Sequence, residues 1–225
     1  MPDVSKIIGV ETGDISKISG VEIGNVTKLA GQTVSIGLDQ LDNNFSMEFD
    51  GVDDYIRVPA FATSGTDWSI SLWWKTTMTG GGRLMLDGSA VNIGGNWGNF
   101  QYVVAWPDST LWNMNHSMSW NDGNWHQAIF TYNYTSGAWK MYIDGTLAVS
   151  QVADTGRDIR NTTTFGAKYT AGSNFFDGNL DEIAYFAAEL SASEISDIYD
   201  ASDSGKTADL STMSTPPVAW YRMGD

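Results

Sequence analysis

The sequence predicts an all-β fold of two packed antiparallel sheets, with one short helix near the C-terminal end and a repetitive segment at the N-terminal end. Three observations lead to this prediction. Short runs of alternating apolar and polar residues recur between turn signals from residue 45 onward. The 225 residues include ten Trp and 24 Gly, which suits strands joined by tight turns. Aromatic side chains bury large areas between facing sheets, so such a chain is usually a sandwich or barrel.

The N-terminal segment contains an 11-residue repeat. The sequence SKIIGV at 5–10 returns as SKISGV at 16–21 and as TKLAGQ at 27–32. Each unit has the pattern of a short strand, a Gly turn and a second short strand. A unit this small cannot bury its apolar side chains alone, so it needs its neighbours, another chain or a partner to pack against.

We therefore divide the chain into a repetitive β stem or docking arm at 1–36 and a β-sandwich at 37–225. The simplest assembly winds the stems of three copies into a homotrimer. A flexible linker is the alternative, although a linker has no reason to hold Ile and Lys in register. The candidate assembly residues are the Lys and the aliphatic residue of each unit: Lys6, Ile7, Lys17, Ile18, Lys28 and Leu29.

Strands are expected in the body of the chain wherever alternation is bounded by turn residues. In the clearest of them Trp68, Ile70, Leu72 and Trp74 share one face, because side chains alternate along a strand. The expected strands span 45–49, 55–58, 68–74, 82–86, 101–105, 126–132, 138–143, 146–149, 163–165 and 178–186.

One helix is predicted near the end of the chain. Ser191 and Glu194 fit a capping box, and Ile195, Ile198 and Tyr199 form an apolar stripe over the following two turns. The final segment, 218–225, has the pattern of a strand. We expect it to close the sandwich by pairing beside the strand at 45–49.

Several segments, in their order and spacing, resemble the laminin-G-like, concanavalin A-like jelly roll. They are FDGVDDYI at 49–56, WSISLW at 68–73, NWH at 124–126, KMYIDG at 140–145 and FDGNLDEIAYF at 176–186. The resemblance implies a two-sheet jelly-roll sandwich. It does not fix the function, because this sandwich is used by lectins, adhesion modules, glycanases and structural domains.

Charge excludes two classes of partner. The 27 acidic residues outnumber the 12 basic ones, giving a formal net charge of −15. Nucleic acids and anionic membranes both require Lys and Arg on the protein, so neither is expected as a partner. No apolar stretch approaches the roughly 20 residues that span a bilayer. The chain has no Cys and no recognisable signal peptide, which fits synthesis in a bacterial cytoplasm.

Catalytic patterns are missing from the sequence. His116 is placed in a polar loop without an evident partner, and His126 follows Trp125 in a strand where a packing role is expected. Glycanases on this sandwich carry an E-x-D-x-x-E strand, whereas Asp181 and Glu182 lack a third acid on the same face. We expect no enzymatic activity.

Two binding sites are proposed from residue type. Laminin-G-like sandwiches hold calcium in the segments that here contain Asp50, Asp53, Asp54 and Asp181, and hard cations prefer such oxygen ligands. Asp50 and Asp53 can equally serve only to form turns. The candidate rings for stacking on a sugar are Trp97, Trp112 and Trp120, although Trp in this fold more often belongs to the core.

Two functions remain open at this point. The N-terminal repeat resembles those at the start of marine-phage virion proteins, which implies a fibre or decoration protein on the virion, in contact with other virion proteins. The alternative is a calcium-supported carbohydrate-binding module for cell-surface glycans. Oligomerisation through the repeat favours the first function, and saturable binding to a polysaccharide favours the second.

Overall fold

The chain divides into two compact units, Met1–Gly37 and Leu38–Asp225, each treated separately. The computed structural model describes residues 6–7, 10–11, 17–18, 21–22, 28–29, 32–33, 38–59, 65–80, 82–87, 91–96, 99–105, 111–152, 155–156, 163–167, 175–202 and 205–223. Within these residues the structure is mostly β, the sheets are antiparallel and one short α-helix lies near the C-terminal end, as predicted.

The first unit contains short antiparallel pairs that recur with the repeat. The first strands of the pairs begin at Lys6, Lys17 and Lys28. The pairs are β1 (Lys6–Ile7) with β2 (Val10–Glu11), β3 (Lys17–Ile18) with β4 (Val21–Glu22), and β5 (Lys28–Leu29) with β6 (Gln32–Thr33). The role of these residues in assembly stays a prediction.

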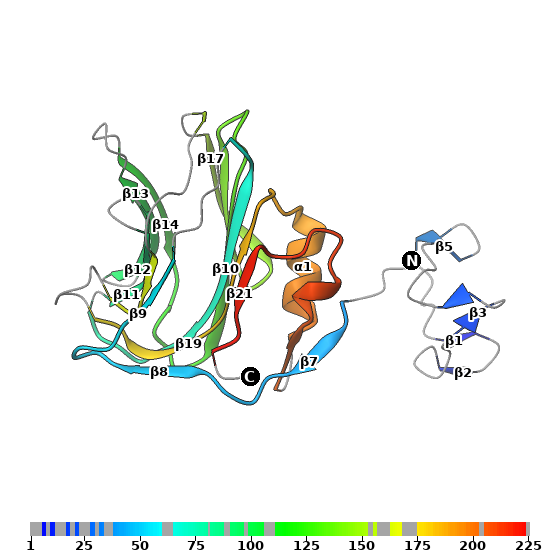
Figure 1. The fold of residues 1–225 in the computed structure, drawn as a ribbon, viewed down its shortest axis with the longest axis horizontal. Coiled ribbons are helices and arrows are strands. Elements are labelled where there is room, and N and C mark those ends of the chain that lie inside the picture. The colour runs from blue at the N-terminus through cyan, green and yellow to red at the C-terminus, as the bar shows by residue number, and fades with distance from the viewer. Residues whose placement is uncertain are drawn as a thin grey trace. The chain divides into compact units, whose positions relative to one another are not determined.

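The second unit is built on two facing sheets (Figure 1). A seven-stranded sheet runs in the order β17-β16-β15-β10-β19-β21, with β8 also paired to β19. Its strands are β8 (Met47–Asp50), β10 (Trp68–Lys75), β15 (Trp125–Tyr132), β16 (Ala138–Ile143), β17 (Thr146–Val152), β19 (Asp177–Phe186) and β21 (Ala219–Tyr221). A six-stranded sheet contains β9 (Ile56–Val58), β11 (Gly82–Asp87), β12 (Val91–Asn96), β13 (Asn99–Ala105), β14 (Leu111–Ser117) and β18 (Thr163–Phe165).

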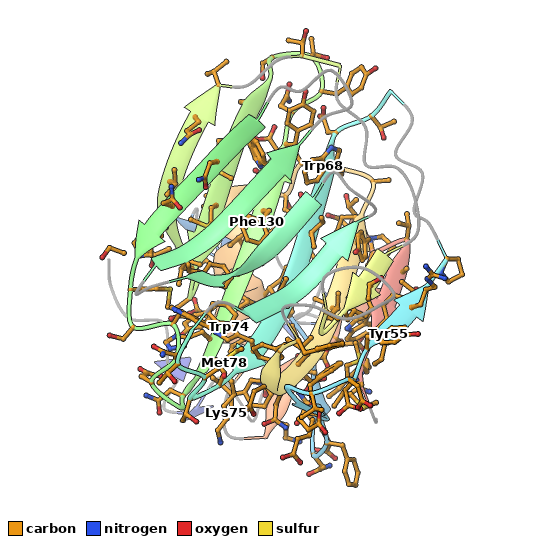
Figure 2. All side chains as sticks on the ribbon, turned by 90° about the vertical axis from the view of Figure 1, so that its left-hand side faces the viewer. Tyr55, Trp68, Trp74, Lys75, Met78 and Phe130 are labelled. Carbon is orange, nitrogen blue, oxygen red and sulfur yellow. The ribbon has the colours of Figure 1, made fainter. Side chains whose placement is uncertain are left out.

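The core between these sheets is aromatic. Trp68, Ile70, Leu72 and Trp74 of β10 are each at most 1% exposed, which confirms the predicted shared face. The Trp74 ring stacks on Phe100 of the opposite sheet with centroids 4.3 Å apart and planes 5° apart. Figure 2 shows Trp68, Phe130 and Trp74 following one another down the sandwich. Buried aromatic surface of this size dominates the stability of such a core.

A third layer covers the outer face of the seven-stranded sheet (Figure 1). Helix α1 (Ala192–Asp200) begins at Ser191, whose hydroxyl accepts from the Glu194 amide while the Glu194 carboxylate accepts from the Ser191 amide. This confirms the predicted capping box. Ile195 and Ile198 are buried in a second apolar cluster with residues of the sheet. Two further elements complete the layer: β7 (Gln40–Asp42) paired with β20 (Lys206–Ala208), and the 3₁₀ helix η3 (Leu210–Thr212).

The last strand pairs with a different partner from the one expected. β21 joins the sheet, but it pairs with β19 through Ile183 and Tyr221, not with β8. β8 pairs with the preceding part of the same strand, Leu180 opposite Met47, so both segments occupy one edge of β19. The predicted partner was wrong because β19 is ten residues long and pairs with both short strands.

Four strands of the second unit were not predicted: β7, β12, β14 and β20. β12 was overlooked because Gly94 and Gly95 weaken its pattern. His116 was expected in a polar loop, but residues 111–117 form β14. Met114 is fully buried while Asn113 and Asn115 on either side are exposed, so a strand forms despite the low β-propensity of Asn. In the described part of the chain, no helix is long and apolar enough to cross a membrane.

Candidate functional site

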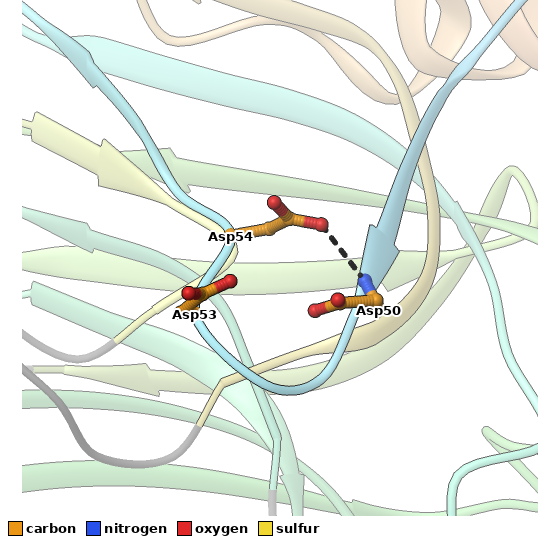
Figure 3. A group of neighbouring side chains, drawn as sticks. All are labelled: Asp50, Asp53 and Asp54. Atoms are coloured by element: carbon orange, nitrogen blue, oxygen red, sulfur yellow. Dashed lines mark hydrogen bonds between the residues drawn. The ribbon is translucent and has the colours of Figure 1, made fainter.

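Three of the predicted calcium ligands come together in the turn that follows β8 (Figure 3). Carboxylate oxygens of Asp50, Asp53 and Asp54 lie within 4.8 Å of one another, and all three residues are exposed. The turn is also held internally, because Val52 N donates to Asp50 Oδ1 at 2.8 Å and Asp50 N donates to Asp54 Oδ2 at 3.1 Å. The cluster therefore has the ligand chemistry of a hard-cation site and also the hydrogen bonds of an ordinary turn.

Asp181 does not belong to this cluster. It lies in the interior of β19, opposite Trp73 in the ladder, and is 3% exposed. One of its carboxylate oxygens accepts from Glu182 N at 2.8 Å. The prediction of Asp181 as a calcium ligand beside Asp50 was wrong, because the strand buries it on the outer face of the sheet, away from the turn.

Only one of the three side chains predicted to stack on a sugar, that of Trp120, is described by the structure. Trp120 is 1% exposed, and its carbonyl accepts from Trp74 Nε1 at 2.8 Å, so it is a core residue and its prediction as a sugar platform was wrong. Trp112 lies in β14, but its side chain is outside the description. Trp97 lies outside the described residues.

A cavity of about 290 Å³ opens over the outer face of the seven-stranded sheet. Its floor comes from β10, β15 and β19. One wall is the segment 43–46 between β7 and β8, and the other contains residues around the start of β20. Asn43 N donates to Gly205 O at 2.8 Å, which joins the two walls. The cavity is lined by Asn43, Asn44, Phe45, Ser46, Trp73, Trp125, Asp181, Ser202, Gly205, Lys206 and Thr207.

The floor of the cavity is aromatic. Trp73 points to the opposite side of β10 from buried Trp74, because successive side chains alternate. Its ring stacks on Tyr199 of α1 with centroids 5.8 Å apart and planes 7° apart, which fixes its position. Trp125 begins the neighbouring strand, faces the same side and is 40% exposed. Phe45, on the wall, is 63% exposed, so the cavity offers both ordered and accessible aromatic surface.

Polar groups complete the walls. The side-chain oxygen of Asn43 is buried and accepts no hydrogen bond among the described residues. Ser46 Oγ accepts from Asn179 Nδ2 at 3.2 Å, which leaves its own hydroxyl proton to be donated elsewhere. Lys206 Nζ donates to Asp42 Oδ1, and the Lys206 ammonium lowers the pKa of that carboxyl.

A buried carboxyl follows Asp181 of the cavity floor in the sequence. Glu182 is 3% exposed, and its two oxygens accept from Trp220 Nε1 at 2.5 Å and from Arg222 Nε at 3.3 Å. Burial, with the charge of Asp181 adding to it, raises the pKa of Glu182 to about 7. Arg222 Nη2 also donates to Asp42 O at 2.7 Å, so the C-terminal strand is tied to the wall of the cavity.

His126 is part of a structural hydrogen-bond network. Its Nδ1 lies 2.9 Å from Asp144 Oδ2, and its Nε2 lies 3.2 Å from Asp122 Oδ1. The bond to Asp144 is the main reason that the pKa of His126 is raised. The ring packs 5.4 Å from that of Trp74, in keeping with the packing role expected from the sequence.

Comparison with known families gives one match over most of this unit. The model of the concanavalin A-like lectin/glucanases superfamily matches residues 50–196. The chain belongs to this superfamily. The matched part of the concanavalin A-like domain contains Trp73, Trp125 and Asp181. Both walls of the cavity lie outside it, with residues 43–46 on one side and residues 202 and 205–207 on the other. The floor is thus part of the common fold, and the walls are added by flanking segments of this chain.

Solved structures share the fold at low sequence identity. The ligand-binding domain of botulinum neurotoxin serotype D in complex with N-acetylneuraminic acid is 15% identical, over 77% of this chain and 49% of that one, with a TM-score of 0.55. The binding domain of serotype G is 14% identical, over 80% and 48%, with a TM-score of 0.57. The native heptameric SAP-like pentraxin of Limulus polyphemus is 12% identical, over 79% and 94%, with a TM-score of 0.56.

This chain spans about half the length of the botulinum structures. A search of curated proteins found no match. The concanavalin A-like assignment therefore rests on the family match, and the structures support the fold alone.

Proposed function

We propose that this concanavalin A-like domain is a non-enzymatic carbohydrate-binding module that holds a sugar in the cavity over its outer sheet face. The observation that carries the proposal is Trp125, a ring 40% exposed at a cavity with polar walls. Sugar rings present apolar C–H faces and hydroxyl edges. A site that combines aromatic surface with a few placed polar groups matches both.

The comparisons give this proposal support at the level of the fold. One structural relative is a ligand-binding domain in complex with N-acetylneuraminic acid. The shared part is 49% of that chain, so the likeness does not assign the sugar to this portion. The proposal is therefore argued from the cavity of this chain and not from the position of a ligand in a relative.

A binding function without catalysis fits the environment of Glu182. Glycoside hydrolysis needs an acid of raised pKa that reaches the glycosidic oxygen. Glu182 has a raised pKa, but it is buried and both of its oxygens accept from Trp220 and Arg222. Its carboxyl is thus engaged in holding the C-terminal strand and is closed to a substrate.

Calcium is proposed as a supporting ion at Asp50, Asp53 and Asp54. The three exposed carboxylates are close enough to share one cation. Binding would screen their mutual repulsion and hold the turn between β8 and β9.

The test is sugar binding by two matched variants. Trp125→Ala removes the exposed ring of the cavity, and Leu147→Ala removes a comparably exposed apolar side chain of β17, outside the cavity. We expect the intact chain to bind a subset of a neutral and acidic glycan array, Trp125→Ala to lose that binding, and Leu147→Ala to retain it. Equal binding by Trp125→Ala and the intact chain would contradict the proposed site. Melting curves of both variants control for folding.

The virion function stays a prediction. Neither the family match nor the botulinum and pentraxin structures bear on it, and the same holds for the homotrimer and for contacts with other virion proteins. A glycan-binding module displayed on a virion would satisfy both functions, since the stem and the sandwich are separate units.

A further inference from the structure

A row of three side chains crosses the outer face of the seven-stranded sheet beside the cavity. It consists of Trp125 of β15, Lys75 of β10 and Asn179 of β19, and Lys75 is the ladder partner of the other two. We propose, resting on the proposed function, that this row selects sugars that carry a carboxylate. The sugar ring lies on Trp125, and the carboxylate pairs with the Lys75 ammonium.

The register of the strands brings these side chains together. Lys75 lies two residues after Trp73 in β10, so its side chain leaves the sheet on the same outer face. Residues directly opposite each other in antiparallel strands have Cβ atoms about 4.5–5.5 Å apart. Lys75 is therefore flanked by Trp125 on one side and by Asn179 on the other. Figure 2 shows Lys75 below Trp74, toward the lower end of the sandwich.

The Lys75 ammonium is open to a ligand. Lys75 is exposed at the end of β10, and its ammonium makes no ion pair or hydrogen bond with the residues that the structure describes. The other two Lys residues described in this unit are engaged, Lys206 with Asp42 and Lys140 with Glu189. Lys75 can therefore bind an anionic group without first giving up an internal ion pair.

The charged groups of the cavity lining do not oppose this preference. Lys206 and Asp181 are the charged residues of the lining, and their charges have opposite signs. The lining itself therefore has no net charge. Lys75 is outside the lining but beside Trp125, so it adds one positive charge at the edge where that ring is exposed.

The acidic residues near the row are placed away from this edge or are already engaged. Glu48 of β8 is exposed and lies opposite Asn179, on the side of Asn179 that is remote from Lys75. Asp122, in the turn before Trp125, accepts from Asn124 N at 2.8 Å, and its Oδ1 lies 3.2 Å from His126 Nε2. The positive charge of Lys75 is thus the local charge beside Trp125, although the whole chain carries −15.

Asn179 gives the row a hydrogen-bond donor. Its Nδ2 donates to Ser46 Oγ of the cavity wall at 3.2 Å. An amide nitrogen carries two protons, so a second N–H is left for a ligand. A sugar acid matches the whole row, because it has a C–H face for the ring of Trp125, a carboxylate for Lys75 and hydroxyls for Asn179.

The experiment compares pairs of sugars that differ only at C6. The probes are methyl β-glucoside with methyl β-glucuronide, and methyl β-galactoside with methyl β-galacturonide, titrated at neutral pH against the full chain by tryptophan fluorescence. We expect the uronate of at least one pair to bind about fivefold more tightly than its neutral partner, the factor that a favourable exposed ion pair gives. This ratio should shrink near 1 M salt, where the Debye length is about 3 Å.

Two variants of equal charge change separate Lys75 from the overall field. Lys75→Gln removes the ammonium beside Trp125, and Arg57→Gln removes an exposed cation of β9, in the other sheet and outside the lining. We expect Lys75→Gln to bring the ratio to about one, and Arg57→Gln to leave it unchanged. Lys75→Arg should keep the preference. Melting curves of all three variants control for folding.

The glycan array gives a second measurement that does not depend on single sugars. We expect the intact chain to bind glycans that carry a carboxylate, and Lys75→Gln to lose these while keeping any neutral glycans. An array on which every bound glycan is neutral would overturn the inference.

The other contradicting results are equally specific. Equal binding of both members of each pair, or tighter binding of the neutral sugar, would refute the selection while leaving the cavity as a sugar site. Equal effects of Lys75→Gln and Arg57→Gln would assign the preference to net charge and not to Lys75. If no probe binds and Trp125→Ala leaves array binding unchanged, the proposed function fails and the selection fails with it.

Discussion

Burial of Glu182 makes the stability of the domain depend on pH in a defined direction. Its pKa is raised from 4.5 to about 7, first by burial and then by the charge of Asp181. Between these two values the folded chain holds a proton that the unfolded chain has released. Stability therefore falls as pH rises through this window, and the loss is complete above about pH 7.

The size of the effect follows from the shift in pKa. One unit corresponds to 1.36 kcal/mol, so a shift from 4.5 to about 7 destabilises the folded state by about 3 kcal/mol at pH 8 relative to pH 4. Glu182→Gln removes the titration, but its amide nitrogen cannot accept, so it loses one of the two hydrogen bonds from Trp220 and Arg222 at every pH. We therefore expect the difference between the two unfolding free energies to shift by about 3 kcal/mol in favour of the variant between pH 4 and pH 8.

The assay is urea unfolding of both proteins at a series of pH values from 4 to 9. The difference between the two unfolding free energies isolates Glu182 from other titrating groups, including His126, whose raised pKa also reduces stability as pH rises. Parallel curves at all pH values would refute the reasoning. A difference that shifts in favour of the parent as the pH rises would mean that Arg222 stabilises the charged form more than burial opposes it.

Three further predictions concern other parts of the molecule. Gln127 is 1% exposed, and neither polar atom of its side-chain amide has a hydrogen-bond partner among the described residues. Gln127→Met should therefore raise the free energy of unfolding by about 1–3 kcal/mol. A decrease would show that water satisfies the amide. Calcium added to chelator-treated protein should raise the melting temperature, and Asp53→Asn should abolish the rise; an equal rise in the variant would rule out the cluster. The solution mass of the full chain should be that of a trimer and should fall to a monomer when the chain starts at Ser35, whereas two monomers would remove the stem's role in self-assembly.

Local sequence signals accounted for most of the fold. The alternation at 68–74 placed four side chains in the core, because a strand repeats every two residues. The capping box at Ser191 set the first residue of α1, because it satisfies backbone groups that only a helix start leaves open. The turn at Asp144-Gly145 joined β16 to β17, with both residues at positive φ.

The candidate site could not be predicted from local sequence patterns. Its walls come from residues near 45 and near 205, and its floor comes from strands between them in the sequence. Trp120 and Trp125 both lie in polar, Asn-containing segments of the sequence, yet one is 1% and the other 40% exposed, and no local pattern distinguishes them. One usable signal was present: Trp73 interrupts the alternation of β10 with a large ring on the outer face.

The shared edge of β19 has a consequence for incomplete chains. β8 pairs with residues 177–180 of this edge and β21 pairs with residues 183–185. The backbone pairing of the edge is therefore complete only when the C-terminal strand is present. A ribosome that stops before residue 219 would release a sandwich in which residues 183–185 of this strand have open backbone donors and acceptors on that edge. Such an edge recruits strands from other molecules. Truncated products should therefore be lost as aggregates and not persist as less stable monomers.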